Sequence, residues 1–371
     1  MSIARRLESI NRRVMYAVLR GVLRNREVAS PIDATNVRSV LILRHDAIGD
    51  MVVTTAAIDL LKRRIPGVAV DVIASTRNAG VIRNDPRVRG VHIYRKGVSE
   101  IVRLSRELRG NNYDIIFAFV LSKTTEAGLL ANAIGGQRAI KVAVRNDDRA
   151  HLYSTFFNLQ VSAPRFTRSM AEILAGVVAD SFGWSLQQSD VRMSLHLSDA
   201  HRAHARRFHD AQPQLPFVAV NISSGNDYRK WSFERNEAFV RAVLARHPEL
   251  RVVVVSSPDD YDEACRLIPL DSARVAIAPM TQDILDVAAI LEGALIVVSP
   301  DTSIIHIASA IGAPALTLYS QIASHYTEWM PFGVPFEAVI TMGKVPIDSL
   351  EVAVVMEAFE SLYVKVGGVR V

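Results

Sequence analysis

Short apolar segments alternate with helical stretches along most of this chain, and this alternation most limits the folds open to it. Nine mainly apolar segments have the length of buried strands, namely residues 39–43, 68–74, 92–94, 115–120, 140–144, 217–222, 251–256, 295–298 and 315–319. Helical stretches between them include 51–64, 170–182, 199–210, 234–247, 284–291 and 303–311, with a last helix at 348–363. Strands of continuous apolar character that are joined by helices predict parallel sheets covered on both faces.

The alternation of strands and helices occurs in two separate series, which predicts two domains. The chain has 371 residues, whereas one core usually serves roughly 150 to 180 residues. We predict two doubly wound, Rossmann-like α/β domains that face a cleft, at 35–190 and 191–345. A helix and linker at 1–34 precede them, and a C-terminal helix and tail at 346–371 follow. Ligands of such folds bind at the carboxyl ends of the strands.

Composition excludes several classes of protein. Hydrophobic residues make up 49% and charged residues 22% of the chain, which is typical of a soluble globular protein. The net charge of +5 is too small to indicate nucleic-acid binding. A single cysteine, Cys265, excludes an intramolecular disulfide and a zinc site with several thiolates. Since no apolar run approaches a membrane span or the core of a secretory signal, we expect a cytoplasmic protein.

The first 26 residues hold seven arginines and one acid, Glu8, and the rest of the chain is nearly neutral. Apolar residues from Ile3 to Val22 recur at helical spacing, which predicts an amphipathic helix over 3–24. The helix either lies on an anionic membrane surface or packs against the second domain or a partner subunit. The first interpretation would make the protein peripheral on the inner face of the cytoplasmic membrane.

A first polar segment, residues 44–50, lies where a buried strand turns into a helix. It begins with Arg44 and ends with Gly49 and Asp50. Gly49 permits a close approach of another group. Asp50 is either a helix cap or a carboxylate that acts as a general base at the cleft.

A second polar segment, residues 299–314, again joins a strand to a helix. Backbone amides at such a helix start, with the hydroxyls of Thr302 and Ser303, suit a diphosphate. Asp301 suits sugar hydroxyls. His306 lies one turn into the helix, where it either reaches the same ligand or packs in the core.

A third polar segment, residues 221–231, follows the first strand of the second domain. Small residues and two cations suit a phosphate dianion, and they are Ser223, Ser224, Gly225, Arg229 and Lys230. A solvated loop is the alternative.

Ser122 and Lys123 follow strand 115–120 and either line the cleft or form a surface loop. No set of residues completes a metal site, and neither G-x-G-x-x-G nor a P-loop occurs.

Together, three patterns resemble glycosyltransferase family nine, which includes the bacterial lipopolysaccharide heptosyltransferases. They are R-x-D-x-I-G-D before a helix, a Ser-Ser-Gly loop followed by cations and Trp231, and D-T-x-x-x-H-x-A-x-A-x-G-x-P. The resemblance spans about residues 40–329. This chain departs from the family at Ser303, where glycine is usual, at Arg229, where lysine is frequent, and in its additional N-terminal helix.

The resemblance implies a GT-B fold and an inverting, metal-independent transfer of a sugar, typically heptose from ADP-heptose, in lipopolysaccharide core synthesis. It assigns the catalytic base to Asp50 and donor binding to Asp301, Thr302 and His306. It further implies a nucleotide diphosphate sugar as co-substrate, no bound cofactor, and a lipid-linked saccharide acceptor. From their places after the strands, we expect Arg44, Gly49, Ser122 and Lys123 on the acceptor side of the cleft. A nucleotide-sugar epimerase or hydrolase and a non-catalytic sugar-binding protein are the alternatives.

Overall fold

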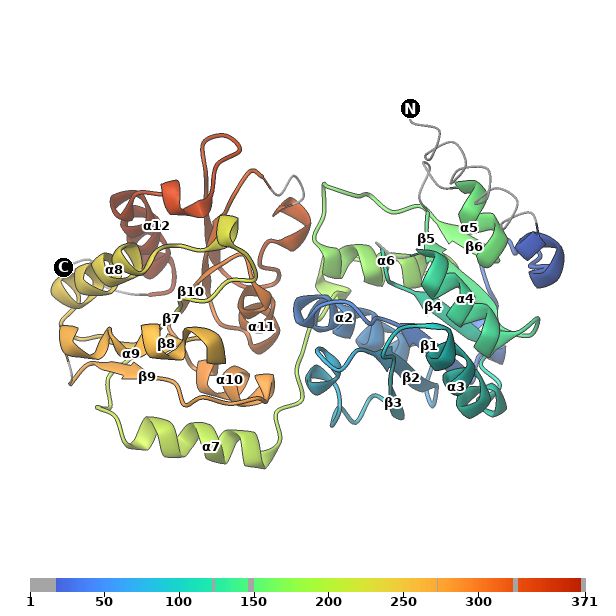
Figure 1. Cartoon of the computed structure of the whole chain (residues 1–371), viewed down its shortest axis with the longest axis horizontal. Coiled ribbons are helices and arrows are strands. Elements are labelled where there is room, and N and C mark those ends of the chain that lie inside the picture. Colours follow the sequence, from blue (N-terminus) through green and yellow to red (C-terminus); the bar gives the residue numbers. More distant parts are fainter. Residues whose placement is uncertain (1–17, 122–123, 146–149, 272, 323–325, 368–371) are drawn as a thin grey trace. The chain divides into compact units, whose positions relative to one another are not determined.

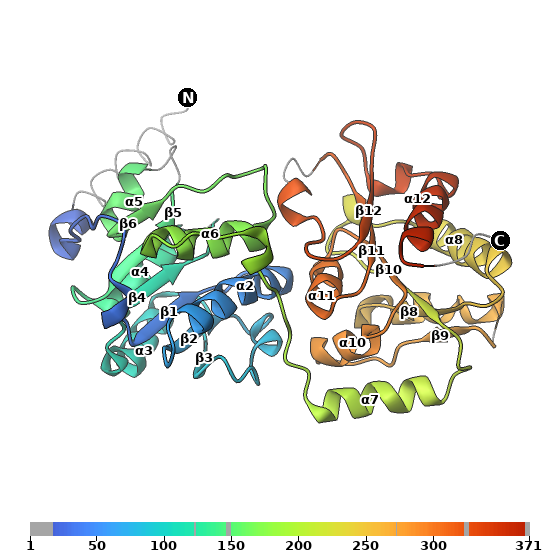
Figure 2. The ribbon, with the colours of Figure 1, turned by 180° about the vertical axis from the view of Figure 1, so that it is seen from behind.

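The computed structural model describes residues 18–121, 124–145, 150–271, 273–322 and 326–367. The chain forms two compact units (Figure 1, Figure 2). The first unit contains the residues up to Ala47 together with Thr54–Pro164 and Ala171–Val191. The second unit contains Arg192 onward together with two short segments, Ile48–Val53 and Arg165–Met170.

The first unit is built on a six-stranded parallel sheet. Its strands run in the order β3-β2-β1-β4-β5-β6. In the register of the central strands, Val40 on β1 pairs with Val70 on β2 and with Ile115 on β4. The strands are β1 Ser39–Leu43, β2 Ala69–Ala74, β3 Gly90–Ile93, β4 Ile115–Ala118, β5 Ile140–Val144 and β6 Leu159–Val161. The helices are α2 Ile48–Arg64, of which Ile48–Val53 group with the second unit, α3 Val98–Leu108, α4 Thr124–Gly135, α5 Ala150–Phe156 and α6 Met170–Phe182.

Helices cover both faces of the first sheet. Leu41 and Leu43 of β1 face a core cluster to which α3, α4 and α5 contribute buried residues such as Leu104, Leu130 and Phe156. Successive strand residues point to opposite faces, so the neighbouring strand residues Val40 and Ile42, which are also buried, face the other side. Helices α2 and α6 lie on that side (Figure 1, Figure 2).

The second unit repeats this plan with the strand order β12-β11-β10-β7-β8-β9, all parallel. Its strands are β7 Phe217–Asn221, β8 Arg251–Val255, β9 Val275–Ile277, β10 Ile296–Pro300, β11 Ala315–Tyr319 and β12 Phe336–Ile340. Its helices are α7 Asp199–Asp210, α8 Phe233–Arg246, α9 Tyr261–Cys265, α10 Ile284–Leu291, α11 Ser303–Ile311 and α12 Val352–Lys365. Phe239 of α8 and Phe359 of α12 belong to one core cluster with Val220 and Val252 of the sheet.

The two doubly wound parallel sheets confirm the predicted fold class. In both sheets the chain starts in the middle and moves first to one edge and then to the other. The strand order reverses between β1 and β4 in the first unit and between β7 and β10 in the second. At such a point the loops that follow the two neighbouring strands run in opposite directions, which leaves room for a ligand at the carboxyl ends of the strands.

The end of the basic N-terminal segment packs against the first unit, a position that the sequence did not predict. Residues 18–23 are helical, and Leu19 and Leu23 contact the cluster beneath α3, α4 and α5. The chain then continues as Asn25, whose side-chain amide donates to the Asn132 side chain at 2.8 Å and to the Thr155 carbonyl at 3.0 Å. The rest of the predicted helix, residues 3–17, lies outside the described residues. In the described part of the chain, no helix combines the length and the apolar character needed to cross a membrane.

Candidate active site

Asn221, the last residue of β7, organises the carboxyl end of the second sheet. Its side chain is buried, and its Nδ2 lies 3.1 Å from the Ser223 carbonyl, 2.9 Å from Ser299 Oγ and 3.2 Å from Thr302 Oγ1. One amide thus joins the loop after β7 to the loop after β10 at the point where the strand order reverses. Asn221 is the first residue of the third polar segment, but the sequence assigned it no role. Its place at the end of a strand was the available signal.

The start of α11 supplies the backbone amides that the sequence predicts for a diphosphate. Thr302 caps this helix, since its hydroxyl accepts a hydrogen bond from the Ile304 amide at 3.3 Å. Ser303 is the first helical residue. The first amides of a helix have no acceptor within the helix and carry the positive end of its dipole, so they attract an anion placed before them.

Arg229 and Asp301 form a weak ion pair near the N-terminus of α11. Arg229 Nε lies 3.3 Å from Asp301 Oδ2, and Arg229 Nη1 donates to the Asp301 carbonyl at 3.4 Å. Asp301 is only 7% exposed, and this burial raises the pKa of its carboxyl group while the charge of Arg229 opposes the rise. The long distances and the lack of a bidentate arrangement leave the guanidinium able to bind a stronger anion.

The loop after β7 is held in place by the loop after β8. Ser223 Oγ accepts a hydrogen bond from the Ser257 amide at 2.7 Å, and Ser224 Oγ donates to the Asn226 carbonyl at 2.8 Å. Gly225 has open space around the position of a Cβ atom. The loop therefore presents small groups at the carboxyl ends of the strands.

Lys230 has partners that the sequence did not predict. Its Nζ donates to Asp260 at 3.0 Å and to Glu263 at 3.1 Å. Burial raises the pKa of Asp260, but hydrogen bonds from Ser223, Lys230 and Ser257 outweigh it and the net shift is downward. Two carboxylates thus hold Lys230, whereas its neighbour Arg229 pairs with Asp301.

His306 lies buried in α11, with its ring 5.6 Å from the ring of Trp329. A Cβ atom at Gly49 would come within 2.8 Å of His306 Cδ2, so only glycine fits at position 49 without a shift. Gly49 and Asp50 belong to the first turn of α2, which groups with the second unit. Asp50 is partly exposed there. The structure thus brings Gly49, and the turn that carries Asp50, to His306.

The predicted acceptor-side residues are placed only in part. Arg44 follows β1 in the first unit with its side chain fully buried, and its Nη1 donates to Asp46 Oδ2 at 3.2 Å and to the Phe119 carbonyl. These contacts make Arg44 part of the support of that loop. Ser122 and Lys123 lie outside the described residues. Among the residues that the structure describes, no three His, Cys, Asp or Glu side chains gather as a metal-ligand set.

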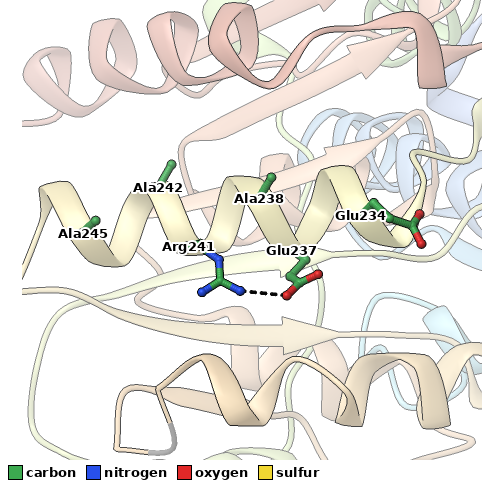
Figure 3. Close-up of a pocket in the computed structure, with 6 residues that line it drawn as sticks. All are labelled: Glu234, Glu237, Ala238, Arg241, Ala242 and Ala245. Carbon is green, nitrogen blue, oxygen red and sulfur yellow. Dashed lines mark hydrogen bonds and ion pairs between the residues drawn. The ribbon is translucent and has the colours of Figure 1, made fainter.

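A surface hollow of about 420 Å³ lies elsewhere, along the outer face of α8 (Figure 3). All of its lining residues belong to this one helix: Glu234, Glu237, Ala238, Arg241, Ala242 and Ala245. Figure 3 shows Glu237 and Arg241 paired with each other across one helical turn. None of these residues follows the carboxyl end of a strand, so the hollow is separate from the polar cluster described above.

The sequence matches the model of glycosyltransferase family 9 (heptosyltransferase) over residues 101–342. It is 21% identical to lipopolysaccharide heptosyltransferase 3 of Escherichia coli over 295 residues, which cover 76% of this chain and 83% of that protein. Three solved structures are also similar to this chain, and they share its two-sheet, GT-B-like fold.

A family 9 glycosyl transferase of Veillonella parvula DSM 2008 has a TM-score of 0.74 at 16% identity, with 88% of this chain and 97% of that chain covered. ADP-heptose lipopolysaccharide heptosyltransferase II of E. coli has a TM-score of 0.72 at 15% identity, with 88% and 99% covered. The E. coli heptosyltransferase WaaC with ADP has a TM-score of 0.69 at 20% identity, with 87% and 99% covered.

Proposed function

Because this chain belongs to glycosyltransferase family 9, the heptosyltransferases, we propose that it transfers a heptose from ADP-heptose to a lipid-linked saccharide of the lipopolysaccharide core, with inversion and without a metal ion. One observation carries the proposal. Asn221 joins the Ser223 loop to the start of α11, beside the Arg229–Asp301 pair, where a parallel sheet binds its ligand. The likeness to WaaC, which has been solved with ADP and with ADP-2-deoxy-2-fluoro heptose, supports ADP as the nucleotide.

The diphosphate of the donor binds before the first turn of α11. Backbone amides there and the hydroxyl of Ser303 contact its oxygens, and the Ser223 loop bounds it on the other side. Arg229 turns from Asp301 to the diphosphate, because the doubly charged diphosphate is the stronger partner. Asp301 is then available to accept hydrogen bonds from the hydroxyl groups of the sugar.

In the transfer step, an acceptor hydroxyl oxygen attacks the anomeric carbon from the side opposite the diphosphate. The bond between that carbon and the diphosphate oxygen breaks, and the hydroxyl proton moves to the carboxylate of Asp50. Negative charge then develops on the leaving diphosphate, where the α11 amides and Arg229 stabilise it. His306 lies next to Gly49, the residue that precedes the proposed base.

The test is a turnover assay with ADP-heptose, with and without a lipid-linked saccharide acceptor, in the presence of excess EDTA. We expect ADP and glycosylated acceptor to appear together, at a rate that EDTA leaves unchanged. Equal release of heptose without acceptor would instead indicate a hydrolase, and an altered sugar still attached to ADP an epimerase. Donor binding with no product from any acceptor would indicate a sugar-binding protein.

We also propose that the N-terminal segment contacts an anionic membrane on the cytoplasmic side. Leu19 and Leu23 face the first unit, whereas Val18 and Val22, one position before each, are 60% and 69% exposed. Arg24 and Arg26 are exposed as well. Exposed apolar side chains among unbalanced arginines suit the interface of a bilayer that contains acidic lipids. The enzyme would meet its lipid-linked acceptor on that surface.

A further inference from the structure

Glu328 is a buried carboxylate that receives three hydrogen bonds from a distant part of the chain. Arg165 Nε donates to Oε1 at 2.5 Å, Arg165 Nη2 donates to Oε2 at 3.0 Å, and the Phe166 amide donates to Oε1 at 2.9 Å. The Glu328 side chain is only 1% exposed, whereas that of Arg165 is 30% exposed. This bidentate pair is much closer than the pair of Arg229 with Asp301.

The donors lie on a short segment that leaves the first unit. Residues Arg165–Met170 group with the second unit, although the residues on either side belong to the first. Phe166 has a φ of +69°, in the left-handed region that few residues other than glycine adopt. The hydrogen bond from the Phe166 amide to Glu328 helps to hold this conformation. Glu328 thus fixes both the side chain and the backbone of the segment.

The next residue, Trp329, extends this contact to the candidate donor site. Glu328 and Trp329 share a single turn of 3₁₀ helix, Tyr326–Trp329. The carbonyl of Trp329 accepts a hydrogen bond from the Tyr319 hydroxyl at 2.7 Å, and its ring packs edge-on against the ring of His306. Tyr319 ends β11 and is fully buried, and its pKa is raised by burial and then by the charge of Asp301.

A four-residue 3₁₀ turn has little intrinsic stability, because its hydrogen bonds are poorly aligned and few. Its position therefore depends on its side-chain contacts. Glu328 forms an ion pair on one side of this turn. On the other side Trp329 contacts Tyr319 and His306, and the Tyr326 ring packs against the Tyr319 ring. A shift of Glu328 would consequently move the Trp329 ring, against which His306 packs.

We propose that Glu328 is a positioning residue for donor binding, which acts through Trp329 on His306. The inference rests on the proposed function, because it assumes that His306 contacts the bound nucleotide sugar. It assigns the Arg165–Glu328 pair to the organisation of the donor site rather than to the stability of the fold alone.

The test compares the ADP affinity of Glu328→Gln with that of the unaltered enzyme by calorimetry, at a temperature well below either melting point. Glutamine keeps the size of the side chain and an acceptor for the Phe166 amide but loses the ion pair with Arg165. We expect ADP binding to weaken by about tenfold and the KM for the sugar nucleotide to rise by a similar factor, with kcat changed less than threefold.

Asp71→Asn is the matched control, since Asp71 is equally buried and Arg89 binds it in a bidentate manner at 2.9 and 2.6 Å in the first unit. That variant should lose stability and keep its ADP affinity. If Glu328→Gln behaves in the same way, the inference is wrong.

A double-mutant cycle with His306→Asn identifies the route of the effect. If Glu328 acts through His306, its substitution weakens ADP binding no further in the His306→Asn background. Full additivity of the two effects on ADP binding would show that Glu328 does not act through His306. If Glu328→Gln does not fold, Arg165→Lys and Trp329→Phe replace it, because they perturb the same contacts by smaller changes. Each is then combined with His306→Asn, and ADP affinity is measured as before. Failure of the proposed function is distinct, because then the unaltered enzyme itself would not bind ADP.

Discussion

Arg229 and Lys230 are neighbours in the sequence, but the structure gives them different partners. Asp301 holds Arg229 loosely, whereas Asp260 and Glu263 both bind Lys230. We therefore expect Arg229→Ala to weaken ADP binding by about 1.5 to 3 kcal/mol, the range for a charge-assisted hydrogen bond. Lys230→Ala should reduce ADP affinity much less and should instead lower the melting temperature. Calorimetric titration of both variants with ADP checks this, and equal losses of affinity would contradict the assignment.

The proposed role of Asp50 is tested by measuring the rate of transfer and the affinity for ADP separately. Asp50→Asn removes the proposed base while it keeps the size and polarity of the side chain, so transfer should slow by about 10² to 10⁴. ADP affinity should stay within a few-fold, because the proposed donor contacts lie on α11 and the Ser223 loop. If Asp50 only caps α2, the variant would lose about 1 kcal/mol of stability and keep its rate. Single-turnover kinetics and thermal unfolding distinguish the two.

At the scale of the element, the sequence predicts best those strands that are buried on both faces. The bounds of β1, β5 and β11 agree with the prediction to the residue, as do those of α6, α7, α10 and α11. Strands β6, β9 and β12 were not predicted. They are edge strands, and two of them have only three residues, while Phe336 at the start of β12 is 37% exposed. A strand that is very short, or one that is half-exposed, lacks the continuous apolar run on which the prediction depends.

Most of the residues of the candidate site could be predicted from the sequence, but their side-chain partners could not. Residues such as Ser223, Thr302 and Asp301 could be named because each follows a predicted strand, and parallel strands bring their carboxyl ends to one edge. Side-chain partners could not be predicted, since they depend on tertiary packing. Lys230 meets Asp260 30 positions away, and Arg165 meets Glu328 163 positions away. No pattern in the sequence links residues at those separations.

The strand β5 carries a buried lysine that fastens the N-terminal segment. Lys141 is fully buried, and its Nζ donates to Asn25 Oδ1 at 2.9 Å, to the Ala139 carbonyl at 3.1 Å and to Asn158 Oδ1 at 3.3 Å. These acceptors are uncharged, and burial lowers the pKa of Lys141 to about 8 from 10.5. Between these two values the unfolded chain keeps a proton that the folded protein has released.

The contribution of Lys141 to stability should therefore rise with pH through that interval, by at most about 1.4 kcal/mol per pH unit. Urea unfolding of the unaltered protein and of Lys141→Met at pH 7.5, 8.5 and 9.5 measures it. The difference in the free energy of unfolding between the two proteins should move in favour of the unaltered one as the pH rises. A difference that is constant across this range would show that Lys141 does not lose its proton there.

At the scale of the whole molecule, the positive charge is concentrated at one end of the chain, because residues 1–26 hold seven arginines and one acid. We expect the protein to sediment with vesicles that contain acidic phospholipid and not with neutral vesicles, and salt should weaken this binding. Val18→Asp together with Val22→Asp should abolish sedimentation at an unchanged melting temperature. Val98→Asp with Val102→Asp, also on exposed helical positions, is the matched control. Equal sedimentation of both double variants would contradict a membrane contact through this segment.

In the proposed reaction, one direct displacement moves the sugar from ADP to the acceptor. The decisive test is the anomeric configuration of the transferred heptose, determined by NMR on product made from ADP-heptose in the presence of EDTA. A single displacement with Asp50 as base predicts product in which the anomeric configuration of the donor is inverted. Product with the donor's configuration retained, or a reaction that stops when EDTA is added, would contradict it.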